Sequence, residues 1–359
     1  MRIRRSRPPF GADGPGQPRA HDNRCGSYDP AVRIIVFGAG AVGSLIGGRL
    51  HQSGADTVLV ARPAHAHAIG EGGLRIRTAN GTDVVDVPAV SSLAALRPHP
   101  DDVVLITAKT QDTPPIHDAL LAWNPSAAIV CGTNGVDHER AALRRFARVY
   151  GMVVQLPAEF EHPGEVTVLC GPTNALLDVG RYPFGVDALA IELALVLDAA
   201  PHLSAIADDD IMVKKYGKLL VNLGNVPDAA CGLVGRRHPL TTLAGEEGTR
   251  AYEAAGIRWE QPTDRVASYA ERMATMRFAI PEGDTFLGGS TWQGLAKGAT
   301  SLETDYFNGE IVLLGRLHGV DTPANEFLQH FGDRMLRERI PAGTLTTDQL
   351  SAEWDAWLA

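Results

Sequence analysis

A glycine-rich turn near residue 40 has the composition of a phosphate-binding loop. Gly38-x-Gly40-x-x-Gly43 directly follows a short β-branched run and opens an amphipathic stretch. In such a turn the first glycine permits a tight bend, the second lets a pyrophosphate approach the backbone, and the third lets helix and strand pack closely. The start of the helix supplies N–H donors and the positive end of its dipole. We therefore predict a dinucleotide-binding turn formed by Gly38, Gly40, Ala41, Val42 and Gly43.

The residue at the end of the second predicted strand discriminates between the two nicotinamide cofactors. An enzyme that uses NAD places an acidic residue there to bind the ribose 2′-hydroxyl. This chain has Val60-Ala61-Arg62 instead, with no acid. Because a guanidinium is suited to pairing with a 2′-phosphate, Arg62 favours NADP(H). The alternative for Arg62 is a solvated surface side chain.

Two further polar segments follow strand-like runs. The run 102–108 is followed directly by Lys109, and the run 127–131 is followed by Asn134-Gly135. In an open parallel sheet, ligands bind outside the carboxyl ends of the strands. Lys109 and Asn134 are therefore placed where a ligand would lie, although Asn134-Gly135 on its own is equally typical of a plain turn.

One helical segment carries polar side chains among leucines and valines. Lys218, Asn222 and Asn225 fall within roughly 60° of one another when each residue turns the helix by about 100°. Buried polar groups need hydrogen-bond partners. The stripe therefore either pairs internally with another polar element or lines a polar ligand pocket, and the pattern alone does not separate these alternatives.

A second group of polar residues lies further along the chain, in Gly288-Gly289-Ser290-Thr291 and from Glu303 onward. Glu303, read in isolation, is typical of a carboxylate on a helix surface. The histidines are scattered and no HxxxH or HExxH pair lies on a predicted helix, so we expect no metal site.

The elements that would position these residues change type part-way along the chain. Up to about residue 187, apolar runs alternate with helical stretches, which is typical of a doubly wound, mostly parallel sheet. Asn80-Gly81 predicts a hairpin between two short strands, and 165–170 predicts one more strand. The strand-like runs are 32–37, 57–61, 102–108, 127–131 and 149–155, and later helical spacing covers 187–199, 210–224, 263–278, 302–318 and 324–339.

These patterns predict an α/β Rossmann-like doubly wound sheet followed by an all-helical C-terminal domain. We assign residues 31–203 to the NADP-binding domain and 204–359 to the helical domain with the substrate and catalytic residues, and expect a cleft between them. Residues 1–30 are rich in arginine, proline and glycine and lack the apolar core of a secretory signal. They are expected to be a disordered N-terminal extension.

Composition restricts the class of protein. A length of 359 residues favours two domains, and 45% hydrophobic with 21% charged residues is an ordinary globular balance. The net charge of −9 argues against nucleic acid or an anionic membrane as the main partner. The four cysteines show no CxxC spacing, which favours a reduced, cytoplasmic protein. No transmembrane span is predicted, and the apolar helical faces are compatible with a homodimer.

Taken together, the motifs resemble those of the ketopantoate reductase family (2-dehydropantoate 2-reductase). The resemblance runs in the family's order from residue 32 to about 335. Its last two motifs are fairly specific. The matching segments are GAGAVG at 38–43, VAR at 60–62, TAK at 107–109, NGV at 134–136, KLLVN at 218–222 and ETDYFNG at 303–309.

The resemblance implies a Rossmann domain with a helical domain, NADPH as hydride donor and a small 2-oxo acid bound between the domains. By this likeness Lys218 is the catalytic lysine and Glu303 its acidic partner. The biological purpose would be the synthesis of pantothenate and hence coenzyme A. The likeness assigns Asn222 and Ser290 to the substrate, and Arg62, Lys109 and Asn134 to the cofactor. Asn225, on the same predicted helical face as Lys218, is a further candidate for binding the substrate.

Two departures from the family pattern fall on substrate-contacting positions. The second asparagine usually lies eight residues after the lysine, whereas this chain has Val226 there and Asn225 one residue earlier. The serine usually twelve residues before the glutamate is replaced by Thr291, with Ser290 one residue earlier. Reduction of a different 2-oxo acid is therefore one alternative, and a catalytically silent NADP-binding sensor is another.

Overall fold

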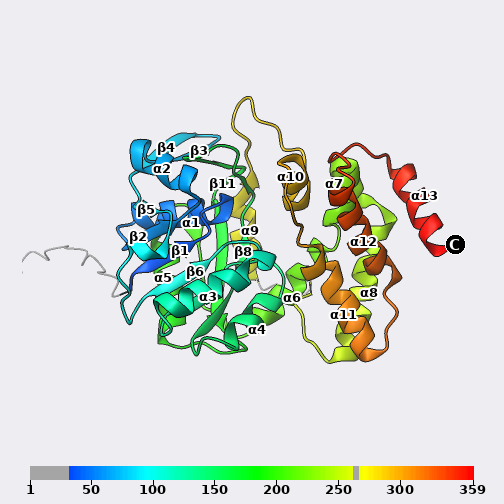
Figure 1. Cartoon of the computed structure of the whole chain (residues 1–359), viewed down its shortest axis with the longest axis horizontal. Helices are drawn as coiled ribbons and strands as arrows, with labels where there is room; N and C mark the ends of the chain where they lie inside the picture. Colours follow the sequence, from blue (N-terminus) through cyan, green and yellow to red (C-terminus); the bar gives the residue numbers. More distant parts are fainter. Residues whose placement is uncertain (1–31, 262–266) are drawn as a thin grey trace, which may run out of the picture.

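The computed structural model describes residues 32–261 and 267–359, so the extension expected at 1–30 lies outside the described residues. Figure 1 shows two parts next to each other, a sheet-containing part in blue to green and a helical part in yellow-green to red. Helix α6 (Ile211–Asn222) lies where the two parts meet. The expected Rossmann-like sheet followed by a helical C-terminal region is confirmed.

The first part is built on an eight-stranded sheet with the order β13-β12-β8-β7-β6-β1-β2-β5. The strands from β5 to β8 in this order run parallel, whereas β12 is antiparallel to β8. β1 and β6 are neighbours although β2 to β5 separate them in sequence, so their carboxyl ends border the crevice where open α/β sheets bind ligands. The bounds are β1 Ile34–Phe37, β2 Thr57–Val60, β5 Ala89–Val90, β6 Val103–Ile106, β7 Ala128–Cys131, β8 Val149–Gln155, β12 Ala175–Arg181 and β13 Leu203–Ser204.

Helices cover both faces of this sheet. In β1, Ile34 and Val36 belong to an apolar cluster shared with α1 and α5, whereas Ile35 belongs to a cluster shared with α3. Successive side chains of a strand point to opposite faces, so a run that is apolar at every position is buried on both. The helices of this part are α1 Ala41–Gln52, α2 Pro63–Gly72, α3 Thr113–Trp123, α4 Asp137–Leu143 and α5 Ala188–Ala199.

A smaller sheet with the order β4-β3-β10-β9 lies beside the main one. The hairpin predicted around Asn80-Gly81 is confirmed, because β3 (Leu74–Thr78) pairs antiparallel with β4 (Gly81–Val85). The strand predicted over 165–170 is divided into β10 (Glu165–Val168) and the start of β11 (Cys170–Pro172). β9 is the short strand Ala158–Glu159.

The helical part has one apolar core, to which α6, α7, α8, α11, α12 and α13 all contribute. In addition to α6, these helices are α7 Asn225–Cys231, α8 Pro239–Ala255, α11 Asn308–His318, α12 Pro323–Arg337 and α13 Thr347–Leu358. Helix α10 (Ser290–Ala296) lies between the two parts and packs on α7. Among the described residues, no helix combines the length and the apolar character needed to cross a bilayer.

The single helix predicted over 210–224 is wrong at its end, because α6 stops at Asn222 and α7 starts at Asn225. Pro227 has no N–H to donate to the carbonyl four residues earlier, which belongs to Leu223. That carbonyl instead accepts a hydrogen bond from Asn308 Nδ2 at 3.2 Å. Asn225 therefore lies on a second helix rather than on the helical face it was predicted to share with Lys218.

The helix predicted over 263–278 is also shorter than expected. Within the described residues it forms α9 (Ala267–Thr275), and β14 (Met276–Phe278) follows and pairs antiparallel with β11. Hydrogen bonding to the backbone of a neighbouring strand overrides the helical spacing at these three residues. The segment after α8 thus returns to the sheet-containing part.

Two cations from beyond residue 204 also contact the main sheet. Arg272 of α9 donates to Asp178 of β12 at 2.6 Å, and Lys214 of α6 donates to the same carboxylate at 2.7 Å. Asp178 is only 1% exposed, so these two side chains neutralise a buried charge. The boundary assigned after residue 203 falls inside β13, and a further bridge joins Val179 to Ala207.

Candidate active site

The three glycines between β1 and α1 are needed for different reasons. Gly38 has a φ of +97°, and a Cβ there would lie 2.6 Å from the backbone nitrogen of Ala108. A Cβ on Gly43 would overlap Thr107 Oγ1, so this glycine lets α1 pack against the end of β6. A Cβ on Gly40 would meet nothing closer than the Gly38 carbonyl oxygen at 4.0 Å. The backbone at Gly40 is therefore open, and this cradle fits a dinucleotide pyrophosphate.

Ala41 and Val42 form the first turn of α1 next to this opening. The helical hydrogen bonds begin with Ser44, whose N–H donates to the Gly40 carbonyl at 2.9 Å. The N–H groups of the preceding residues have no partner within the helix. Together with the positive end of the helix dipole, they form a ready site for phosphate oxygens.

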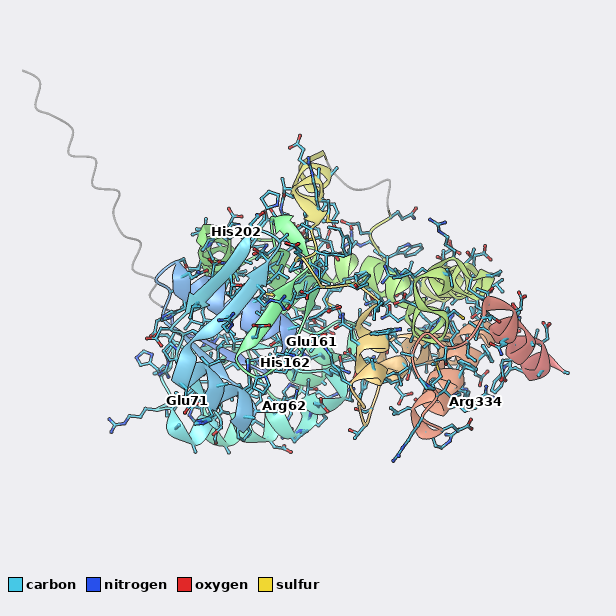
Figure 2. All side chains as sticks on the ribbon, turned by 90° about the horizontal axis from the view of Figure 1, so that it is seen from above. Arg62, Glu71, Glu161, His162, His202 and Arg334 are labelled. Carbon is cyan, nitrogen blue, oxygen red and sulfur yellow. The ribbon has the colours of Figure 1, made fainter. Side chains whose placement is uncertain are left out.

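Arg62 directly follows β2 and is the residue before the first turn of α2. Its side chain is exposed and makes no ion pair with any described residue. Figure 2 shows Arg62 on the sheet-containing part, far from Arg334 on the helical part. A free guanidinium at this strand end can bind an anionic group of a cofactor.

Lys109 and Asn134 lie at the ends of the neighbouring strands β6 and β7. The two loops are joined by Thr110, whose Oγ1 donates to the Asn134 carbonyl oxygen at 3.2 Å. The Lys109 ammonium lies 3.4 Å from the place that a Cβ on Gly294 of α10 would take. Gly294 therefore leaves room for Lys109 between the sheet edge and α10.

Lys218 lies on α6, and its Nζ donates to the carbonyl oxygen of Val154 near the end of β8. The pKa of Lys218 is lowered to about 7, mainly by burial and also by the positive charge of Lys215, while the charge of Glu303 opposes both. An amine with a pKa near neutrality can both hold and release a proton at physiological pH.

Glu303 is buried, with an exposed fraction of 8%, so its interpretation as a helix-surface carboxylate is wrong. It precedes the short 3₁₀ helix Thr304–Tyr306 and accepts a hydrogen bond from the backbone N–H of Thr110 at 3.3 Å. The single hydroxyl proton of Thr110 is shared between the Asn134 carbonyl and Glu303 Oε1, which lies 3.4 Å from Oγ1. Burial raises the pKa of Glu303, while the Lys109 charge and the Thr110 hydrogen bonds lower it. Thr110 thus holds Glu303 at the edge of the sheet.

Asn222 ends α6 and Asn225 begins α7. Both side chains are partly buried, and neither amide forms a hydrogen bond within the described part of the chain. Of the two alternatives for the polar stripe, internal pairing applies to Lys218 alone. Both amides are free to contact a ligand.

Ser290 and Thr291 occupy the first turn of α10 but differ in exposure. Ser290 is exposed, whereas Thr291 is buried. The preceding residue, Gly289, donates its N–H to Asp228 of α7 at 2.6 Å and fixes this end of α10 to α7. The structure thus joins α10 to the helix that carries Asn225, and no hydrogen bond among the described residues joins Ser290 to Lys218 or Glu303.

Two features of the site were missed from the sequence. Thr110 joins the Asn134 loop to Glu303, and its only sequence signal is that it directly follows the motif ending at Lys109. The buried ion pair between Lys215 and Glu139 lies beside the site, and nothing in the spacing of these residues indicates that they meet. In the two described ranges, no group of three or more His, Cys, Asp or Glu side chains is arranged to hold a metal ion.

Comparison with known proteins decides the family. The family model described as "Ketopantoate reductase PanE/ApbA" matches residues 34–181, and its C-terminal counterpart matches residues 210–332. The chain belongs to the ketopantoate reductase family. Members of this family are oxidoreductases that depend on a nicotinamide cofactor.

Individual family relatives are similar over most of their length. A 2-dehydropantoate 2-reductase of Pyrococcus horikoshii is 25% identical over 312 residues, which cover 83% of this chain and 95% of the relative. The corresponding protein of Archaeoglobus fulgidus is 28% identical over 306 residues, and this alignment covers 82% of this chain and 95% of the relative.

Solved structures share the fold. A PanE/ApbA family ketopantoate reductase from Ralstonia eutropha JMP134 superposes with a TM-score of 0.71 at 26% identity, covering 86% of this chain and 99% of its own. A D-mandelate dehydrogenase solved with NADH and anilino(oxo)acetate has a TM-score of 0.70 at 22% identity with the same coverage. The two-part architecture is therefore common to these proteins.

Proposed function

We propose that this protein reduces a 2-oxo acid with NADPH, and that the acid is 2-dehydropantoate, which becomes pantoate. The observation that carries the proposal is the position of Lys218, at the carboxyl edge of the sheet, electrostatically coupled to the buried Glu303. The relatives named 2-dehydropantoate 2-reductase and the free amides of Asn222 and Asn225 support it.

In this proposal Lys218 acts as general acid and stabilises negative charge. The bound cofactor supplies the hydride that adds to the keto carbon. As the carbonyl oxygen gains negative charge, the Lys218 ammonium stabilises it and then donates one proton from Nζ, which leaves a neutral amine. Glu303 orients Lys218 or the substrate hydroxyl, while Asn222, Asn225 and Ser290 bind the polar groups of the substrate.

The pH dependence of reduction tests the role of Lys218. Only the protonated lysine can donate, and its pKa is about 7. We expect kcat for ketoacid reduction to be highest below pH 7 and to fall about tenfold for each unit above the pKa. The measurement is steady-state kcat at saturating substrate between pH 6 and 9. A kcat that stays level to pH 9 would exclude Lys218 as the rate-determining proton donor.

Arg62 provides a test of cofactor preference. Because its guanidinium is free and follows β2, we propose that it pairs with the 2′-phosphate of NADPH. Arg62→Ala should weaken NADPH binding about tenfold to a hundredfold, while NADH binding changes little. Fluorescence titration with both cofactors measures the two affinities. Equal losses for NADPH and NADH would contradict this assignment.

The experiment that tests the proposed function is oxidation of NADPH by the purified protein with 2-dehydropantoate and a panel of other 2-oxo acids. Lys218→Ala serves as the blank. Fast turnover of 2-dehydropantoate that depends on Lys218 is the expected result. NADPH binding without turnover of any acid would favour the catalytically silent sensor.

A further inference from the structure

A buried ion pair lies one helical turn before Lys218. Lys215 of α6 is 3% exposed and Glu139 of α4 is fully buried. Lys215 Nζ donates to Glu139 Oε1 and to the carbonyl oxygen of Thr133 at 3.0 Å, with that of Cys131 at 3.5 Å. All three acceptors belong to the end of β7 and the loop and helix that follow it.

Packing requirements alone do not explain a buried ion pair at this position. Removing two charges from water costs free energy, and apolar residues of similar volume are often neutral or stabilising in their place. The second oxygen of Glu139, Oε2, is buried and has no hydrogen-bond partner. Packing alone therefore gives no reason for charges at these two positions.

The two lysines of α6 have different surroundings. The Lys215 ammonium has an acceptor for each of its three N–H groups, all on the β7 side. Lys218, three residues later on the same helix, has one acceptor, the Val154 carbonyl of the neighbouring strand β8. Lys215 is thus fully engaged in holding α6, whereas Lys218 retains N–H groups for a ligand.

We propose that Lys215 is a positioning residue, which, through its ion pair with Glu139, fixes α6 against the loop 133–136 and so places the Lys218 ammonium beside the bound cofactor. The inference rests on the proposed function for the role of Lys218. The loop that Lys215 holds contains Asn134 and is joined to Glu303 through Thr110. One buried contact thereby sets the catalytic helix relative to both the cofactor loop and Glu303.

Lys215 also acts on Lys218 through its charge. The charged groups that act on Lys218 are Lys215 on its own helix and Glu303 from the segment before α11, and Lys109 acts in turn on Glu303. Burial is the larger cause of the lowered pKa of Lys218, and the Lys215 charge adds to it. Removal of Lys215 and Glu139 together should therefore raise the pKa of Lys218 from about 7.

The test uses the full chain with the double substitution Lys215→Met and Glu139→Leu. Both new side chains are apolar and of similar length, so neither leaves an unpaired buried charge. Lys214→Met is the matched control, because the neighbouring Lys214 also forms ion pairs from α6, but with Asp178 of β12 and Asp208 rather than with Glu139. Thermal unfolding is measured for every variant. If the double variant does not fold, Lys215→Gln with Glu139→Gln replaces it, since this pair of changes removes both charges and keeps polar side chains of similar length.

Two readouts are needed, and one of them requires no substrate. The first is kcat with the best 2-oxo acid found, expected to fall about a hundredfold in the double variant because a shift of about 1 Å in a reacting group has an effect of that size. The second is the pH dependence with which trace acetic anhydride acetylates Lys218, followed by peptide mass spectrometry. Its midpoint should move upward in the double variant and stay in place in Lys214→Met.

The outcomes separate this inference from the proposed function. A folded double variant with an unchanged midpoint or an unchanged kcat overturns the positioning role, as do equal changes in Lys214→Met. If the parent protein turns over no 2-oxo acid, the proposed function fails, and the acetylation midpoint alone then decides whether Lys215 controls the environment of Lys218.

Discussion

Replacing Lys218 with alanine should lower kcat for 2-oxo acid reduction about a thousandfold, since one side chain provides both the proton and the charge opposite the developing oxyanion. The alanine leaves the Val154 carbonyl without its donor, but this carbonyl lies at the edge of the site and water can replace the lysine. Steady-state oxidation of NADPH measures the loss.

The same variant should bind NADPH as the parent protein does. Lys218 lies on α6, whereas the glycine turn and Arg62 lie on β1, α1 and the end of β2. A fluorescence titration that shows normal cofactor affinity therefore separates loss of chemistry from loss of binding. Turnover within tenfold of the parent would refute the catalytic role, and loss of NADPH binding would show that the change reaches beyond the site.

Replacing Gly40 with alanine should weaken NADPH about a hundredfold, or ~3 kcal/mol, and leave the fold intact. Apart from the adjacent residues, the new methyl group would meet no protein atom nearer than 4.0 Å, and the φ of Gly40 is −90°, outside the left-handed region that favours glycine. The methyl group would instead occupy the opening that we assign to the pyrophosphate. Cofactor titration and thermal unfolding of the same sample measure the two effects.

Gly43→Ala is the matched control for this substitution. A Cβ at Gly43 would overlap Thr107 Oγ1 and the Gly38 carbonyl oxygen, so alanine there should lower the unfolding temperature. The two substitutions in one turn should therefore have different effects: Gly40→Ala should lower the affinity for NADPH, and Gly43→Ala should lower the stability of the fold. Normal NADPH affinity in Gly40→Ala would mean that the pyrophosphate binds elsewhere.

The fold was largely predictable from the sequence because its elements have strong local signals. The β-branched run of β1, the glycine turn and the alternation of strand with helix indicated the Rossmann-like sheet, and Asn80-Gly81 indicated the hairpin. The failures arose where a distant partner decides the structure. Met276–Phe278 pairs with β11, a strand about a hundred residues earlier, and local helical spacing carries no information about that partner.

The sequence was sufficient to select the residues of the site, but not to predict their burial or their contacts. Spacing and family likeness selected Lys218 and Glu303, yet Glu303 alone had the pattern of a surface residue. In the structure it is buried and accepts a hydrogen bond from Thr110, 193 positions earlier in the chain. The end of α6 could have been predicted from the sequence, because Pro227 lacks the N–H that a longer helix would need. The pairing of Lys215 with Glu139 spans 76 positions and had no signal in the sequence.

The pairing of β14 with β11 has a consequence for folding: the sheet-containing part needs residues that lie far along the chain. A fragment that ends before residue 210 would leave β11 without its partner strand and would remove both Arg272 and Lys214 from the buried Asp178. An unpaired strand edge and an uncompensated buried carboxylate both favour aggregation or unfolding. We therefore expect the cofactor-binding part to be unstable when it is expressed without residues 210–278. During synthesis, β11 can pair with β14 only after residue 278 has left the ribosome.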